Sequence, residues 1–254
     1  MKRIVAAAVL LLSVVASDHV RAADMPIPSP YAPPPDAAPV FNTLYDWRGL
    51  YVGLNGGYVF GTSAWSDPSN LAATSSGNFR TDGFLAGGTL GGNFQSGALV
   101  FGIEGDIDWQ GLKGSSTSAF CTSVSTTPGG GAAGLNCRTQ SDWLITARGR
   151  IGYAFDRVLL FATGGIAMTD VQAGLSALPF QISLGQIGWA AGGGVEIGLA
   201  GTWTAKVEYL YVNFASASCN VAANCGFDPT VQANDQVKFS ESIVRAGVNF
   251  KFTP

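Results

Sequence analysis

The sequence predicts an all-β protein, an eight-stranded antiparallel up-and-down transmembrane β-barrel, on three observations. Only 12% of the 254 residues are charged, whereas 47% are hydrophobic and 34 are glycine; soluble domains have about 25% charged residues and about 7% glycine. The longest apolar run, Ile4 to Ala16, is shorter than the roughly 18 residues that a membrane helix needs. Beyond Trp47, apolar residues alternate with small or polar ones, and long polar loops alternate with short turns.

Residues 1–22 are predicted to be a Sec-type signal peptide. Lys2 and Arg3 precede an apolar run, and Val20-Arg21-Ala22-Ala23 supplies small residues for cleavage. Cleavage removes three basic residues and one acidic residue, so the net charge changes from −3 to −5, and the only histidine, His19, leaves as well. The mature chain therefore lacks the basic patch that nucleic-acid binding requires, and it has no histidine for a catalytic triad, a metal site or a proton shuttle.

Residues 23–46 are predicted to be a Pro-rich periplasmic tether, and residues 47–254 the barrel. Seven prolines fall between residues 24 and 40. Such a segment favours extended polyproline conformation and contributes no packed core. A Pro-rich ligand for a partner domain is the alternative interpretation.

Period-two alternation defines the predicted strands. In the segment 143–155, for example, Trp143 and Ile151 lie on an apolar face, whereas Arg148 and Arg150 lie on the opposite face. The eight predicted strands are 48–61, 82–94, 99–110, 143–155, 158–171, 186–199, 203–211 and 241–252. Two of them, 82–94 and 158–171, are less regular, because Leu85, Leu159 and Phe161 fall on the face that should be polar or small.

The connections give an independent signal. Predicted loops at 62–78, 112–140, 172–185 and 216–238 alternate with predicted turns at 95–97, 156–157 and 200–202. Outer-membrane barrels have long extracellular loops and tight periplasmic turns, and an even strand number returns the chain to its starting side. The pattern predicts a location in the cell outer membrane, with both termini periplasmic and the long loops extracellular.

The polarity of the two faces distinguishes a membrane barrel from a soluble lipocalin-like barrel. The non-apolar face is mostly Gly, Ala, Ser and Thr, too little charge to solvate an outer wall but suitable for a filled lumen. The apolar face ends in two groups of aromatic residues, as expected at the borders of a bilayer. The loop-side group is Phe60, Phe84, Trp109, Trp143, Trp189 and Tyr211, and the turn-side group is Phe94, Phe101, Phe155, Trp203 and Phe252. The predicted surrounding partner is therefore outer-membrane lipid.

Nine ionisable residues are predicted to face the lumen as a charge network. They are Glu104, Asp106, Asp108, Glu196 and Glu208 together with Arg148, Arg150, Lys206 and Arg245. Acids and bases lie on adjacent predicted strands, so cross-strand pairing is natural. The network is either a conduction path or a plug of salt bridges, and a plug is favoured because barrels of this size are filled by side chains.

An enzyme is not expected. Hydrolytic chemistry in small barrels generally uses a histidine to activate a serine or a water, and the mature chain has none. The trio Glu104, Asp106 and Asp108 faces two arginines on the next strand. Residues 192–198 lack the spacing of a dinucleotide-binding fingerprint. No catalytic residue, metal site or cofactor is predicted.

The four cysteines fall as two pairs, Cys121 with Cys137 and Cys219 with Cys225, in two predicted loops and outside every predicted strand. An even number of cysteines in an exported chain indicates disulfides. Of three connectivities, pairing within each loop is the most economical and would stabilise the fold by roughly 3 and 2 kcal/mol. A metal site is the alternative, but histidine and C-x₂-C spacing are both missing.

Several segments together resemble the outer membrane immunogenic protein family of alphaproteobacteria, small OmpA-like barrels of the porin family. The quoted segments are 47–58, 101–106, 148–153, 194–196, 206–211 and 244–252, and the likeness spans about residues 46–252. The resemblance implies a surface-exposed envelope protein, and some relatives are porins or haem binders. It also implies a C-terminal signal, here Phe250 and Phe252, for the barrel-assembly machinery, although Thr253 and Pro254 follow where the family ends in an aromatic residue.

The predicted function is structural and surface-interactive rather than catalytic, with the extracellular loops available for recognition. The loop composition does not identify an extracellular partner. The alternatives are a narrow porin-like channel for small solutes and a protein that binds a surface ligand such as haem. Without histidine, haem ligation would need Tyr, Met or Cys.

Overall fold

The computed structural model describes residues 45–66, 75–122, 136–175, 182–219 and 235–252. All of them belong to one compact unit, residues 43–254. The predicted signal peptide and residues 23–44 of the predicted tether lie outside the described residues. Within the described part, no helix has the length and hydrophobicity that crossing a membrane would require.

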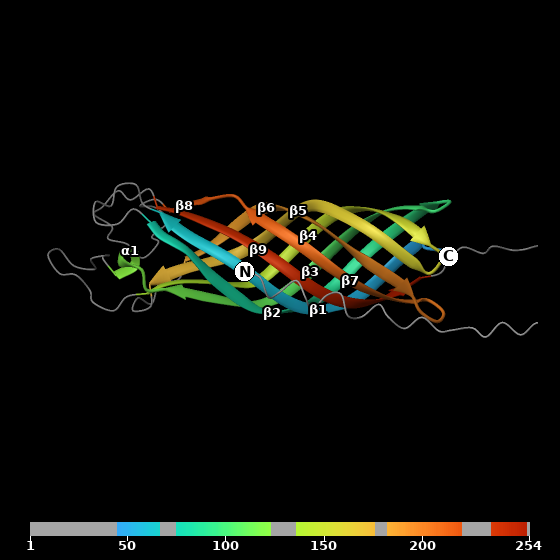
Figure 1. The fold of residues 1–254 in the computed structure, drawn as a ribbon, viewed down its shortest axis with the longest axis horizontal. Coiled ribbons are helices and arrows are strands. Elements are labelled where there is room, and N and C mark those ends of the chain that lie inside the picture. Colours follow the sequence, from blue (N-terminus) through green and yellow to red (C-terminus); the bar gives the residue numbers. More distant parts are fainter. Residues whose placement is uncertain (1–44, 67–74, 123–135, 176–181, 220–234, 253–254) are drawn as a thin grey trace, which may run out of the picture. The chain divides into compact units, whose positions relative to one another are not determined.

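Long antiparallel strands close into a barrel (Figure 1). They are β1 (Gly49–Ser66), β2 (Ser75–Ser96), β3 (Leu99–Ser116), β4 (Cys137–Phe155), β5 (Val158–Leu175), β6 (Ile182–Gly198), β7 (Trp203–Phe214) and β9 (Asp235–Lys251). Pairing of β1 with β9 closes the circle. The short strand β8 (Ala217–Cys219) pairs with β9 beyond the end of β7, and the helix α1 (Ala119–Thr122) follows β3. The predicted eight-stranded antiparallel barrel is confirmed.

The strands extend further than the sequence pattern predicts. β1 continues to Ser66 and β2 begins at Ser75, so most of the predicted loop 62–78 is strand. The other three predicted loops are shortened in the same way. The sequence pattern ends the strands too early because Ser, Thr, Gly and Asn differ little in hydropathy and therefore show no alternation. The backbone hydrogen-bond ladder nevertheless continues through them, for example from Thr62 opposite Arg80 to Ala64 opposite Asn78.

The two ends of the barrel differ in their connections. At the end we call the turn end, tight turns join β2 to β3, β4 to β5 and β6 to β7, and both the start of β1 and the end of β9 lie there. These turns contain residues with positive φ: Gly97 at 60°, Asp156 at 53° and Gly201 at 65°. Glycine adopts this conformation without steric cost, and Asp tolerates it better than most residues. The opposite end is the loop end.

Alternate residues of each strand face outward and are exposed. They include the loop-side aromatic residues Phe60, Phe84, Trp109, Trp143 and Trp189, and the turn-side residues Phe94, Phe101, Phe155, Trp203 and Phe252, whereas Tyr211 is half-buried. Leu90, Ile103 and Ile107 lie outward between the two groups. Exposed side chains of this kind suit a wall that faces hydrocarbon.

The inward residues form layers. Near the turn end, Val100, Ala154, Leu159 and Phe161 make an apolar cluster with Trp47. A second apolar cluster, nearer the loop end, contains Val59, Leu85, Leu112, Leu144, Ala167, Val171, Ala190, Leu210, Val212, Phe214, Phe239 and Ile243. The irregular positions Leu85, Leu159 and Phe161 thus have a structural reason, because they belong to the apolar layers inside the barrel.

Candidate functional site: the charged lumen

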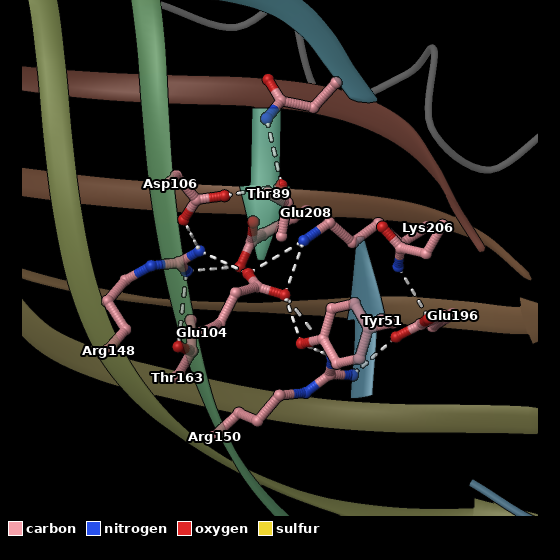
Figure 2. Close-up of polar contacts among 12 residues, drawn as sticks. Tyr51, Thr89, Glu104, Asp106, Arg148, Arg150, Thr163, Glu196, Lys206 and Glu208 are labelled. Carbon is pink, nitrogen blue, oxygen red and sulfur yellow. Dashed lines mark hydrogen bonds and ion pairs between the residues drawn. The ribbon is translucent and has the colours of Figure 1, made fainter. Parts of the chain in front are cut away.

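All nine predicted lumen residues point inward and are buried, with at most 5% of any of them exposed. Figure 2 shows most of this network, which lies between the two apolar clusters and draws on β3, β4, β6, β7 and β9. Period-two geometry places Glu104, Asp106 and Asp108 on the same face of β3. The strand register places two pairs directly opposite each other, Glu104 with Arg148 and Glu208 with Arg245.

Arg148 is the centre of one half of the network. Its guanidinium lies 2.6 Å from Glu104 and 2.6 Å from Asp106, and it lies 2.6 Å from Glu208 on the far side of the lumen. The Nε of Arg148 also donates to the hydroxyl of Thr146 at 3.1 Å. One cation therefore links carboxylates from two strands that are not neighbours.

Arg245 is the centre of the other half. It contacts Glu208 at 2.7 Å, Asp108 at 2.9 Å and Asp106 at 3.1 Å. A side chain added at Gly87 would collide with Asp108, so glycine at this position leaves the space that the carboxylate occupies. The two arginines together hold the acids of β3 and β7.

Glu196 and Lys206 do not pair with each other, although the register places them directly opposite. Glu196 instead contacts Arg150 at 2.7 Å, and Lys206 contacts Glu104 at 2.8 Å. Asn249 and Thr204 donate to the remaining oxygen of Glu196, at 2.9 and 2.5 Å. The pairing crosses the barrel interior, which strand adjacency alone does not reveal.

Tyr51 is a member of the network that the sequence analysis missed. Its hydroxyl donates to Glu104 at 2.8 Å and accepts from Arg150 at 3.0 Å. The sequence contained a signal, because Tyr51 lies on the inward phase of β1, between Leu50 and Val52, which point outward. Neutral groups complete the network in the same way: Thr89 donates to Asp106 at 2.8 Å and Thr146 donates to Asp106 at 2.8 Å.

Glu241 is a buried acid outside the network. It is paired across the strands with Val212, a member of the apolar cluster nearer the loop end, and it accepts a hydrogen bond from Gln110 at 3.1 Å. Gln110 also donates to Ser141 at 2.7 Å. Across the described strands, no Lys or Arg forms an ion pair with Glu241.

The residues just before β1 cover the turn end of the lumen. Trp47 is fully buried, and its backbone N–H and its indole N–H donate to Gln95 at 2.8 Å and to the carbonyl of Asp156 at 3.1 Å. Tyr45, which the sequence analysis placed in the tether, packs edge-on against Trp47. Lys251 donates to the carbonyl of Asp46.

Electrostatic effects at this end are local. A hydrogen bond from Arg48 holds the pKa of the Asp46 carboxyl below its usual value. Burial raises the pKa of the Tyr45 hydroxyl. Asp46 is exposed, whereas the hydroxyl of Tyr45 is buried. Within the described residues neither group forms a hydrogen bond or ion pair with the nine lumen residues, so we assign them no part in the lumen network.

The loop end carries one disulfide within the described residues, Cys121 to Cys137, with the two Cα atoms 5.4 Å apart. It joins α1 to the first residue of β4, which confirms this within-loop pair. The expectation that the cysteines lie outside strands is wrong for Cys137 and for Cys219, the last residue of β8, because the strands extend beyond the alternating region. Cys225 lies outside the described residues, so its pairing with Cys219 stays a prediction.

The lumen is thus filled by side chains that contact one another, although Nε of Arg150 and Oδ1 of Asn249 have no hydrogen-bond partner within the described residues. Each of the five predicted acids contacts at least one Arg or Lys. Among the described residues, no group of three or more His, Cys, Asp or Glu side chains is arranged to hold a metal ion. The nine charged residues thus form a layer inside the barrel with an apolar cluster on either side of it.

Comparison with known proteins agrees with this architecture. A family model described as an outer membrane protein beta-barrel domain matches residues 36–252. The chain belongs to this family. Membership in the outer membrane protein beta-barrel family implies a lipid environment for the outward residues, and the family supports a location in the outer membrane.

Relatives within this family carry names that confirm the resemblance seen in the sequence. The 31 kDa outer-membrane immunogenic protein of Brucella melitensis biotype 1 is 30% identical over 96% of this chain and 99% of its own length. The 22 kDa outer membrane protein of Rhizobium leguminosarum bv. viciae is 28% identical over 81% of this chain and 78% of its own. Among solved structures, Neisserial surface protein A has a TM-score of 0.41 and 14% identity, covering 80% of this chain and 97% of that protein.

Proposed function

We propose that the protein is a closed, non-catalytic structural barrel of the outer membrane, with its long loops exposed on the cell surface and available for recognition. The observation that carries the proposal is the filled lumen. Ten ion-pair contacts among nine buried residues occupy the middle of the barrel, and apolar clusters lie above and below them. Such an interior supports a rigid scaffold better than a transport path.

The placement of the connections supports the proposed orientation. Both ends of the barrel chain, near Gly49 and Lys251, lie at the turn end with the tight turns. In outer-membrane barrels, tight turns are periplasmic and long connections are extracellular. We therefore assign the loop end to the cell surface. We further propose that residues 1–22 are a cleaved signal peptide and that residues 23–46 are a periplasmic tether, of which Tyr45 and Asp46 contact the turn end of the barrel.

An epitope inserted between residues 123 and 135 tests the orientation. We expect antibody to bind it on intact cells, whereas an epitope added after Pro254 should be reached only after permeabilisation. The reverse pattern would contradict the proposed topology.

A deletion strain with increased detergent sensitivity would support an envelope role, and unchanged sensitivity would leave recognition by the loops as the remaining role.

Conductance in planar bilayers tests the closed lumen directly. The purified barrel should give at most small, irregular current steps, like a control reconstitution with heat-unfolded protein. Stable openings of porin size would overturn the proposal and favour the narrow-channel alternative. The apolar layer that contains Leu85 and Leu210 weighs against that alternative, because ions lose hydration when they cross a dry apolar constriction.

A non-catalytic role is supported by the state of the acids. Glu104, Asp106 and Asp108 are each held by an arginine or a lysine inside the barrel, so none resembles the poised acid or base that catalysis needs.

For assembly, we propose that Phe250 and Phe252 form the signal read by the barrel-assembly machinery. The ring of Phe250 contacts Trp203 and Phe252 at 5.3 and 5.5 Å between centroids, which gives an aromatic edge at the end of β9.

A further inference from the structure

Three cations point outward near the loop end on three adjacent strands. Arg80 lies on β2, Lys113 on β3 and Arg138 on β4, and all three are exposed. Within the described residues none of the three takes part in an ion pair. We call these three residues the loop-end cation cluster.

The strand register places the members of the cluster close together. Lys113 is opposite Asp82 on β2 and opposite Gln140 on β4. Arg80 on β2 and Arg138 on β4 each lie two residues nearer to the loop end than these partners of Lys113, so both are diagonal to Lys113. Diagonal neighbours in a sheet are about 7–8 Å apart, within reach of long side chains. One anionic group above Lys113 can therefore be approached by both guanidinium groups.

Two acidic residues near the cluster accept hydrogen bonds from neutral side chains and form no ion pair with the cluster in the described part of the chain. Asp82 accepts a hydrogen bond from the hydroxyl of Tyr58 at 2.6 Å. Asp142 on β4 is half-buried and accepts from Gln172 at 2.9 Å. The cations of the turn end differ from the cluster, because Arg48 forms an ion pair with Asp46 and Arg157 donates to the carbonyl of Leu199. Lys238, another exposed cation of the loop end, is separated from the cluster by β1.

The depth of the cluster relative to the aromatic residues suggests its ligand. Arg80 lies four residues beyond Phe84 on β2, and Lys113 lies four beyond Trp109 on β3. At about 3.4 Å per residue and a strand tilt near 40°, this spacing places the charges roughly 10 Å beyond the loop-side aromatic residues, measured along the barrel axis. The headgroup region begins at that level of a bilayer.

From this geometry we propose that Arg80, Lys113 and Arg138 bind the phosphate group of a lipid in the membrane leaflet that surrounds the loop end. Guanidinium groups form bidentate, charge-assisted hydrogen bonds with phosphate, and an ammonium adds a compact positive charge. The same three strands carry an apolar groove on their outer wall below the aromatic ring, lined by residues that include Gly88, Leu90, Ile103, Ile107 and Ala147. Glycine and alanine leave room there for an acyl chain.

The inference rests on the proposed function in one respect, because the outer leaflet is the surrounding leaflet only if the loops face outward. The chemistry of the site can be tested without that assumption, since nanodiscs present lipid at both ends of the barrel. The test uses full-length mature protein in phosphatidylcholine nanodiscs doped with bisphosphorylated lipid A or, in parallel, with the same lipid after dephosphorylation. After transfer to detergent, native mass spectrometry measures how much doped lipid each barrel retains.

The test variant is Arg80→Gln with Arg138→Gln, and the matched control is Arg48→Gln with Arg157→Gln, which removes two exposed guanidinium groups from the turn end. We expect the wild type and the control to retain bisphosphorylated lipid A roughly tenfold better than the test variant, since each surface cation contributes a few-fold in affinity for an anionic lipid. Dephosphorylated lipid A should be retained equally by all three proteins. Added inorganic phosphate at millimolar concentration should not displace the lipid.

Equal retention of the phosphorylated lipid by the wild type and the test variant would overturn the inference. Equal retention of phosphorylated and dephosphorylated lipid A by the wild type would overturn it as well. Displacement by inorganic phosphate would also overturn it, because it would indicate a general anion site rather than a lipid site. Unchanged heat-modifiable mobility of the variants on a denaturing gel verifies that they are folded. These outcomes are separable from the proposed function, which is tested by conductance and by the surface epitopes.

Discussion

Arg148 illustrates how much depends on a single buried charge. Replacement with leucine leaves Glu104, Asp106 and Glu208 without the guanidinium that each contacts at 2.6 Å. Removal of one partner from a buried ion pair typically costs about 3–5 kcal/mol, because the remaining charges stay desolvated. We expect Arg148→Leu to lower the free energy of unfolding by about that amount, measured by urea titration in phosphocholine micelles.

The matched control is Arg48→Leu, whose ion pair with Asp46 has both side chains more than half exposed. Exposed pairs contribute little to stability because water screens them, so this variant should unfold close to the wild type. A loss of stability in Arg148→Leu no larger than in Arg48→Leu would mean that water or rearranged side chains compensate the buried acids.

The hydroxyl of Tyr51 is a smaller test of the same network. Tyr51→Phe removes the group that donates to Glu104 and accepts from Arg150, while the ring stays in place. Hydrogen bonds to charged partners contribute about 1.5–3 kcal/mol, and we expect a loss of that order in the unfolding free energy. Tyr153→Phe, on the exposed wall, should change stability by less than about 0.5 kcal/mol; equal effects would contradict the role of Tyr51.

At the scale of the residue the sequence places nine ionisable residues in the lumen, because period-two alternation decides the face of each residue, but the predicted set lacks the buried Glu241. It does not predict all of their partners. Glu196 pairs with Arg150 and not with Lys206, which is opposite it in the strand register. The reason is that the long side chain of Arg150 extends across the interior of the barrel. Tyr51 is missing from the predicted network because that network contained acidic and basic residues only.

At the scale of the strand, the destabilisation caused by a charge on the outward face of β2 should depend on how deep in the bilayer that charge lies. Leu90 is exposed between Phe84 and Phe94, where we expect hydrocarbon. Leu90→Arg should destabilise the barrel in vesicles by about 2–4 kcal/mol, whereas a charge near the membrane border costs about 0–1 kcal/mol. Asn78→Arg, on the same strand beyond the aromatic ring, is the matched control, and similar losses in both variants would contradict the proposed position of the bilayer.

The loop end gives a covalent prediction. Non-reducing peptide mapping should recover Cys121 linked to Cys137, as the structure has it, and Cys219 linked to Cys225. Replacement of both Cys121 and Cys137 with alanine should lower the unfolding free energy by roughly 3 kcal/mol on the loop-entropy model. A bridge between the two loops would refute the pairing.

Strand number, order and lipid-facing phase follow from the sequence, because apolar and small residues alternate clearly inside the bilayer. The strand ends do not follow. Ser63 and Trp65 continue β1 well past the last predicted residue, since the backbone pairing that holds them leaves no trace in hydropathy. The disulfide partner Cys137 lies at the start of β4 for the same reason.

The closed ladder and the filled interior together predict the behaviour of the whole molecule in detergent. Every barrel strand is paired on both sides, so the barrel has no unpaired strand edge at which dodecyl sulfate could begin to separate the strands. We expect the unheated protein to migrate differently from the boiled protein on a denaturing gel. Identical mobilities would contradict a stable closed barrel.

Pairing of β1 with β9 also has a kinetic consequence. These strands come from opposite ends of the barrel chain, yet they are in register from Tyr51 opposite Lys251 to Ser66 opposite Gln236. Contacts between distant segments form late, because the connecting chain must first lose its entropy. Until the last hairpin arrives, β1 presents an open edge that another nascent chain can occupy, so a chain that stalls before β9 is synthesised is expected to be prone to intermolecular strand exchange.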